Sequence, residues 1–285
     1  MDFIDLHTHS IASDGTFTPS AVARSASEAG LKAFALTDHD TVSGLDEAAH
    51  EAEAVGIECI RGIELSTSTE DLKPVHILGY WVPEGCDDEY FRVFRHTREV
   101  RNARMIERLN GLGIAVTMDD VAFESEGKAL GRPHIAKALC RKGVVRSIKE
   151  AFAQYIGSGG AAYVPREPLP PSKAVSMLKK LGCTVSLAHP MLIGCNERKT
   201  EEIARSLIPF GLDAVEVYHS SQSPWDERFL TGMAKKLGLL ATGGSDFHGG
   251  NKPEVSVGRG KGGLRIGYFV LDDLRKSRVL NRLPV

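Results

Sequence analysis

The sequence predicts an α/β fold in which parallel strands are covered by helices. Short apolar segments alternate with amphipathic helical patterns over residues 3–80 and again over residues 172–280, and such alternation is typical of parallel sheets. Histidines and carboxylates follow the apolar segments, where parallel α/β folds build their active sites. A chain of 285 residues that is 42% hydrophobic is long enough for one barrel-sized domain or a domain with an insertion.

The first strand is predicted at residues 2–6, directly before a His-Thr-His sequence. Thr18 and Pro19 then supply an N-cap and a first helical residue, and Gly30 ends the helix. Further segments repeat this order, which implies parallel strands. The strands are expected at 33–37, 57–63 and 75–80, with a second helix at 43–56.

The alternation stops after residue 80, and we expect a long helix over 87–112 followed by shorter helical pieces. The sequence therefore predicts a discontinuous barrel domain, 1–94 and 166–285, with a helical insertion at 95–165 that forms a substrate lid. Alternation resumes near residue 172. The remaining elements are expected at 172–181 (helix), 184–188, 214–218, 239–242 and 268–271 (strands) and 272–280 (helix).

Composition excludes several classes of function. The net charge of −2 gives no polybasic signal for duplex DNA or an anionic membrane. No stretch approaches the roughly 20 apolar residues of a membrane span, and the N-terminus lacks the pattern of a signal peptide. The five cysteines are scattered without a CxxC pair, which favours a reducing, cytoplasmic location. No protein partner is evident.

Candidate metal ligands recur at the predicted strand ends. In a strand, residues i and i+2 share a face, so His7 and His9 point the same way; alone, they could equally be two surface histidines. Further histidines and carboxylates at other strand ends favour a metal site. Histidine and carboxylate ligands without cysteine suit Mn, Zn, Fe or Mg, and their number favours two or three ions. The candidates are His7, His9, His39, Glu64, His189, Asp246 and His248 at or after strand ends, with His76 inside its strand and Asp14 in the first loop.

The motifs around these residues resemble one known family. They are His7-Thr8-His9-Ser10, Asp14-Gly15, Thr37-Asp38-His39-Asp40, Gly62-Ile63-Glu64, His76, Ala188-His189-Pro190 and Gly244-Ser245-Asp246-Phe247-His248. In this order they resemble the polymerase-and-histidinol-phosphatase (PHP) family. The resemblance implies a distorted seven-stranded (β/α) barrel related to the amidohydrolases. It also implies three divalent metal ions, often manganese, zinc or iron, and hydrolysis of phosphoesters.

The resemblance also assigns each ligand. A first ion would be held by His7, His9, Glu64 and Asp246; Glu64 would bridge to a second held by His76 and His189; Asp14, His39 and His248 would hold a third. A hydroxide bridging the first two ions would be the nucleophile, because bound metal lowers the pKa of water toward ~7. No catalytic side chain beyond these ligands is expected.

Substrate contacts are expected from the insertion and from three of the ligands. Asn102 falls within an apolar helical face, where its amide needs a partner: either an interhelical hydrogen bond or the substrate. Arg132 precedes Pro133 at a helix start that favours anions, although capping and packing would also explain this sequence. The expected substrate-binding residues are Asp14, His39, Asn102, Ala103, Arg104, Arg132, His134 and His248.

These expectations lead to a metal-dependent phosphohydrolase acting on a small phosphorylated nucleotide. The resemblance to single-chain PHP enzymes with such an insert favours the 3′-phosphate of a nucleoside 3′,5′-bisphosphate. The alternatives are a histidinol-phosphate phosphatase, a 5′–3′ exonuclease on short RNA, a C–N amidohydrolase and a non-catalytic metal-binding module. The basic insert disfavours cationic histidinol phosphate. The intact ligand set disfavours a non-catalytic module.

Overall fold

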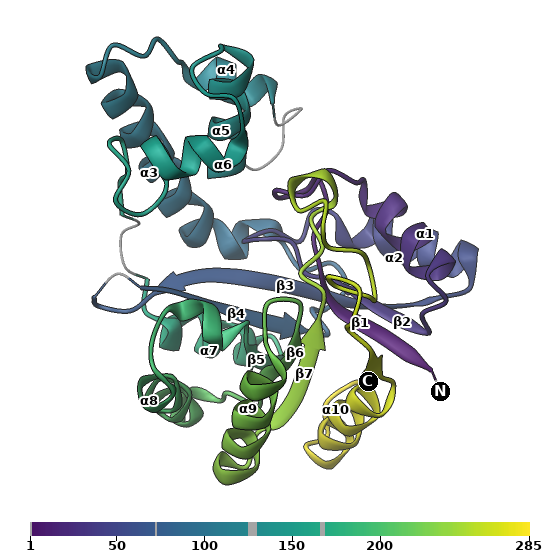
Figure 1. The fold of residues 1–285 in the computed structure, drawn as a ribbon. Coiled ribbons are helices and arrows are strands. Elements are labelled where there is room, and N and C mark those ends of the chain that lie inside the picture. Colours follow the sequence, from purple (N-terminus) through teal and green to yellow (C-terminus); the bar gives the residue numbers. More distant parts are fainter. Residues whose placement is uncertain (1, 72, 125–129, 166–168) are drawn as a thin grey trace.

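The computed structural model describes residues 2–71, 73–124, 130–165 and 169–285. One eight-stranded sheet, in the order β7-β6-β5-β4-β3-β2-β1-β8, curves into a nearly closed barrel with helices outside it (Figure 1). Backbone hydrogen bonds from His9 N to Phe247 O and from Asp246 N to His7 O, both 2.9 Å, join β1 to the segment after β7. The barrel is therefore closed at the end where the candidate ligands lie.

Seven of the eight strands agree closely with the predicted segments. They are β1 (Phe3–Thr8), β2 (Ala33–Leu36), β3 (Glu58–Ser68), β4 (Pro74–Tyr80), β5 (Thr184–Leu187), β6 (Ala214–His219), β7 (Leu240–Gly244) and β8 (Ile266–Gly267). The expected barrel is confirmed; its sheet has eight strands, where the family resemblance implied seven.

Two expectations about the strands are wrong. β4 runs antiparallel to both neighbours, β3 and β5, because β3 extends to Ser68 and a short hairpin leaves no room for a crossover helix. The last strand is not at 268–271: helix α10 (Phe269–Leu280) already begins there. Only β8 precedes it, and it pairs antiparallel with β1.

The helices outside the sheet follow the predicted start and stop signals. Thr18 caps α1 by accepting a hydrogen bond from Ala21 N, and Gly56 ends α2 in the left-handed conformation. The barrel helices are α1 (Pro19–Glu28), α2 (Leu45–Val55), α7 (Pro171–Lys180), α8 (Glu197–Leu207) and α9 (Pro224–Leu237), besides α10.

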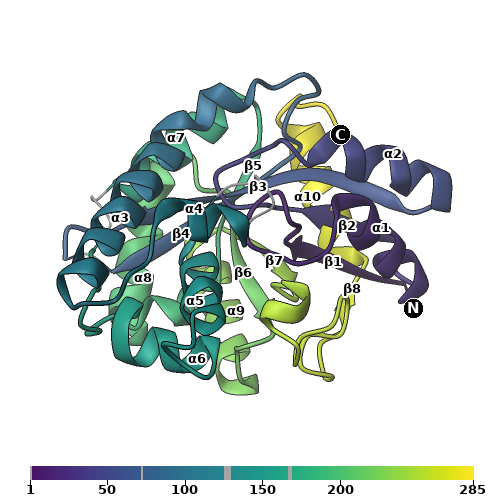
Figure 2. The same cartoon turned by 90° about the horizontal axis from the view of Figure 1, so that it is seen from above.

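A second group of helices lies above the sheet in Figure 1 and over one half of it in Figure 2. It comprises α3 (Arg92–Gly111), α4 (Met118–Phe123), α5 (Arg132–Arg141) and α6 (Ile148–Ala151), and α3 follows the 3-10 turn η1 (Asp88–Phe91). Most of their buried apolar side chains form a cluster separate from the two barrel clusters, while Phe94 near the start of α3 packs into the barrel core. The predicted end of the insertion at residue 165 adjoins 166–168, which lie outside the described residues.

Within the described ranges, no helix combines the length and the apolar composition needed to cross a bilayer.

Candidate metal centre

Strand β1 carries two imidazoles to one point. His7 lies within the strand and His9 follows it, and both side chains are fully buried. Because side chains two residues apart share a face of a strand, their Nε2 atoms lie 3.1 Å apart. Thr8 between them points the other way and donates from Oγ1 to the carbonyl of Ala35 on β2.

Glu64 and Asp246 complete a four-residue group around these imidazoles. Glu64 Oε2 lies 3.2 Å from Nε2 of both His7 and His9, and Asp246 Oδ1 lies 3.7 and 3.4 Å from the same two atoms. Ligands at about 2.1 Å from a tetrahedral ion are separated by about 3.4 Å. The spacings of 3.1–3.7 Å that involve the two imidazoles match this separation, and donor atoms of His7, His9 and Asp246 lie within 4.8 Å of one another.

The two oxygens of Glu64 serve two groups. While Oε2 faces the first group, Oε1 lies 2.9 Å from Nδ1 of His76 and 2.9 Å from Nε2 of His189. His76 comes from β4 and His189 follows β5, so three strands meet at one fully buried carboxylate. A carboxylate in this position can bridge two ions.

A third group lies beside the first. His248 Nε2 is 3.2 Å from Asp14 Oδ1, and His39 Nε2 is 3.9 Å from Asp14 Oδ2. Nitrogen and oxygen atoms of these three residues and of His9 lie within 4.8 Å of one another. All nine predicted metal ligands thus lie in one cluster, although they come from separate parts of the chain.

Backbone strain marks two of these positions. His189 and Asp246 have φ angles of 25° and 58°, a region that non-glycine residues rarely adopt and that destabilises the fold by about 1–3 kcal/mol per residue. Such strain persists only where surrounding contacts fix the conformation, and it is common at functional sites. Both residues follow strands at the centre of the cluster.

The carboxylates dominate the electrostatics of the cluster. Burial opposes a charged imidazole, yet Glu216 and Glu64 hold the pKa of His7 well above its usual range. Against the same burial, hydrogen bonds to Asp246 and Glu64 raise the pKa of His9 to about 9. Burial opposes ionisation of Glu64, but the neighbouring imidazoles hold its pKa well below normal. The cluster therefore attracts positive charge, which divalent ions can supply at neutral pH.

Sequence reasoning missed Glu216, which orients two of the predicted ligands. Its Oε1 accepts a hydrogen bond from Nδ1 of His7 at 2.9 Å, and its Oε2 accepts from the backbone N of His189 at 2.7 Å. A carboxylate behind a ligand imidazole fixes which ring nitrogen faces the metal. The available signal was one carboxylate within the apolar strand segment Ala214–His219.

Substituting Glu216→Gln should weaken the binding of a divalent metal ion by about 10–100-fold, the usual effect of removing a group that orients a ligand. The measurement is a direct binding isotherm with manganese as the probe ion. Glu254→Gln, on an exposed part of the chain, is the matched control. An unchanged manganese affinity in Glu216→Gln would show that Glu216 does not support the cluster.

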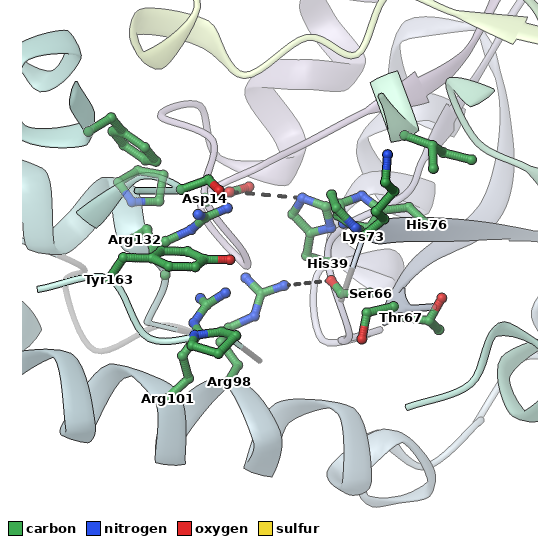
Figure 3. A pocket seen from close by; sticks show the side chains of 18 of the residues that line it. Asp14, His39, Ser66, Thr67, Lys73, His76, Arg98, Arg101, Arg132 and Tyr163 are labelled. Atoms are coloured by element: carbon green, nitrogen blue, oxygen red, sulfur yellow. Dashed lines mark hydrogen bonds and ion pairs between the residues drawn. The ribbon is translucent and has the colours of Figure 1, made fainter. Parts of the chain in front are cut away.

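A cavity of about 1050 Å³ opens at the cluster. Arg98, Arg101, Arg132 and Tyr163 lie on one side of it, and Lys73 lies with His76 on the other (Figure 3). The cavity therefore joins the candidate ligands to a group of arginines from the helical group above the sheet.

The residues of α3 that line this cavity differ from those predicted from the sequence. Asn102 is fully buried and donates from Nδ2 to the carbonyl of Leu130, in the segment before α5, at 2.9 Å, so its amide has a partner within the protein. Arg98 and Arg101, one turn and one residue earlier, line the cavity instead. Among the described residues, the lining omits four of the predicted substrate contacts, Asn102, Ala103, Arg104 and His134.

Of the two substrate contacts predicted at the start of α5, Arg132 lines the cavity and His134 does not. Arg132 lines the cavity, with its guanidinium 5.5 Å from the centre of the Phe152 ring. His134 is buried, and its Nδ1 accepts a hydrogen bond from Gly131 N at 3.0 Å. Asp14, His39 and His248 line the cavity as well as belonging to the ligand cluster.

Comparison with known proteins places this site in a family. The PHP domain model matches residues 5–157. A 5′-3′ exoribonuclease of Haemophilus influenzae is 31% identical over 86% of this chain and 89% of its own length. A 3′,5′-nucleoside bisphosphate phosphatase of Chromobacterium violaceum is 31% identical over 93% of this chain and 90% of its own.

A solved structure agrees with these relatives. The crystal structure described as a metal-dependent phosphoesterase of Bifidobacterium adolescentis is 32% identical, covers 98% of this chain and 96% of its own, and superposes with a TM-score of 0.84. The matched relatives are named as enzymes that cleave phosphoesters. We conclude that the chain belongs to the PHP domain family and is a phosphoesterase of that family.

Proposed function

We propose that the chain is a metal-dependent phosphohydrolase that removes the 3′-phosphate of a nucleoside 3′,5′-bisphosphate. The observation that carries this proposal is the cavity, which joins two ends that would bind anions: the ligand cluster, once divalent ions occupy it, and the three arginines Arg98, Arg101 and Arg132 (Figure 3). A substrate with two phosphates matches both ends. Arginine binds phosphate through paired N–H groups.

The nine predicted ligands would hold three divalent ions, with manganese as the first choice. Such ions act as Lewis acids toward phosphoryl oxygens and lower the pKa of water. The chain itself positions this chemistry: Glu216 holds the ring of His7, and Glu64 faces two groups of histidines. The five cysteines are free thiols, which supports a cytoplasmic location.

The helices α3–α6 would act as the lid over the substrate. Arg132 and Phe152 lie at the cavity edge supplied by these helices, so a base could stack there while the arginine binds the second phosphate. The arginines disfavour histidinol phosphate, whose amine is cationic. No feature of the described residues favours a C–N amidohydrolase over a phosphoesterase.

A short RNA is the second candidate substrate. The cavity of about 1050 Å³ lies at the upper end of the range for small-molecule sites, about 300–1,000 Å³. Its other side, lined by Ser68, Lys73 and Ile193, offers room for a second nucleotide. The relative named as an exoribonuclease agrees with this alternative.

A phosphate-release screen tests the proposed function. Manganese-loaded protein should release phosphate from nucleoside 3′,5′-bisphosphates faster than from nucleoside monophosphates or histidinol phosphate, and a chelator should abolish release. A 5′-phosphorylated dinucleotide that is cleaved faster than the bisphosphate would favour the exonuclease. Turnover of histidinol phosphate alone would contradict the proposal.

Arg132→Met should raise KM for the bisphosphate by about 10–100-fold, because one charge-assisted contact to phosphate contributes about 1.5–3 kcal/mol. The same change should raise KM much less for a nucleoside 3′-monophosphate, which lacks the second phosphate. Steady-state kinetics on both substrates measure the difference. Arg146→Met, at an exposed position, is the matched control, and an equal KM increase for both substrates would place Arg132 elsewhere.

A further inference from the structure

Lys252 lies beside the ligand cluster, and the proposed reaction has given it no role. Its Nζ is 2.5 Å from Asp246 Oδ2, and the residue lines the cavity next to His248 and Asp14. The Lys252 side chain is 38% exposed, so it is paired with Asp246 without being buried. The positive charge of Lys252 therefore lies close to the place where a phosphate would bind.

The loop that carries Lys252 is tied to the cluster. It follows His248 through the short turn Gly249–Asn251. Asn251 donates from Nδ2 to the carbonyl of Asp14 at 2.6 Å, and Gly250 donates from its backbone N to Thr16 Oγ1 at 2.7 Å. The position of the Lys252 backbone is therefore fixed against the loop that carries Asp14.

Asp246 uses its two oxygens differently. Oδ1 faces the imidazoles of His7, His9 and His248 at 3.7, 3.4 and 3.3 Å. Oδ2 meets Lys252 Nζ at 2.5 Å and also lies 3.4 Å from Nε2 of His219. Lysine thus neutralises the oxygen that the first ligand group does not use. An ammonium has three N–H donors, so one contact to a carboxylate leaves two for the cavity.

We propose that Lys252 binds a non-bridging oxygen of the phosphate that is cleaved, while the same ammonium holds Asp246. This rests on the proposed function as a phosphohydrolase. The compact charge of lysine suits a single phosphate oxygen, and negative charge on the transferring phosphoryl group is stabilised by a preorganised cation in a water-poor site. Lys252 is then a catalytic residue that complements the metal ions.

The test uses manganese-loaded full-length protein with Lys252→Met, Lys252→Arg and the exposed control Lys261→Met. Lys252→Met should lower kcat/KM by about 100-fold, as removal of one charge-stabilising donor does, with bound manganese unchanged by elemental analysis. Lys252→Arg should recover part of the loss. Inorganic phosphate should raise the Tm of the wild type and of Lys261→Met, and should raise that of Lys252→Met much less.

Two outcomes would overturn the proposal. If Lys252→Met loses manganese and its remaining metal-loaded fraction responds to phosphate like the wild type, Lys252 only positions Asp246. If phosphate shifts the Tm of both forms equally, or of neither, Lys252 does not bind phosphate. The phosphate titration does not depend on turnover, so a wild type that hydrolyses no nucleotide would refute the proposed function separately from this inference.

Discussion

Glu64→Gln should reduce phosphate release by at least about 1,000-fold, because even residues that only orient a ligand typically contribute about 10–100-fold. Glutamine keeps the shape of Glu64 but has one oxygen and no charge. It can therefore face either His7 and His9 or His76 and His189, which Glu64 contacts through different oxygens. The second group would then meet an amide N–H, which cannot bind a metal ion.

The measurements for Glu64→Gln are phosphate release and the number of bound metal ions per chain. At least one ion should be lost, since two ligand groups share this carboxylate. Glu84→Gln, at an exposed position, controls for the loss of one negative charge. Full metal content together with wild-type turnover would mean that Glu64 bridges nothing, and the proposed arrangement of three ions would have to be abandoned.

The convergence of the ligands was predictable from sequence because it follows from two local rules. Side chains alternate along a strand, and parallel strands end at one edge of a sheet. His7, His9 and His189 obey these rules directly. Helix boundaries were equally local: Thr18 caps α1 and Gly56 ends α2 by their own side-chain and backbone chemistry.

The parts that were not predicted depend on contacts between distant segments. The direction of β4 depends on β3 continuing to Ser68 and turning back in a hairpin, which periodicity alone does not reveal. Asn102 and Arg98 lie on the same helix, but Asn102 is held by a contact within the helical group and Arg98 by contacts to Asp40 and Ser66 of the barrel. The roles of Glu216 and Lys252 appear only when distant strands and loops meet.

Arg98→Met should destabilise the protein by about 3–5 kcal/mol, the usual effect of removing one partner of a buried ion pair. Arg98 Nη2 lies 2.7 Å from Asp40 Oδ2, and the two side chains are 8% and 0% exposed. Arg98 also donates to Ser66 Oγ at 3.0 Å. A fall in Tm of about 6–10 °C is expected from this loss. Arg92→Met, which removes an exposed ion pair between the start of α3 and Glu89 of η1, should change stability by less than about 1 kcal/mol.

The same pair connects the insertion to the metal centre. Asp40 follows the predicted ligand His39, has a φ of 59°, and accepts a hydrogen bond from Ser66 N on β3 at 2.7 Å. Without Arg98, the buried carboxylate of Asp40 would lack its counter-charge, and we expect the loop that carries His39 to become less ordered. Adding Asp40→Asn to Arg98→Met removes that charge and should recover a large part of the lost stability, as measured by thermal unfolding. Strictly additive losses in the double variant would show that the two residues do not act as a pair.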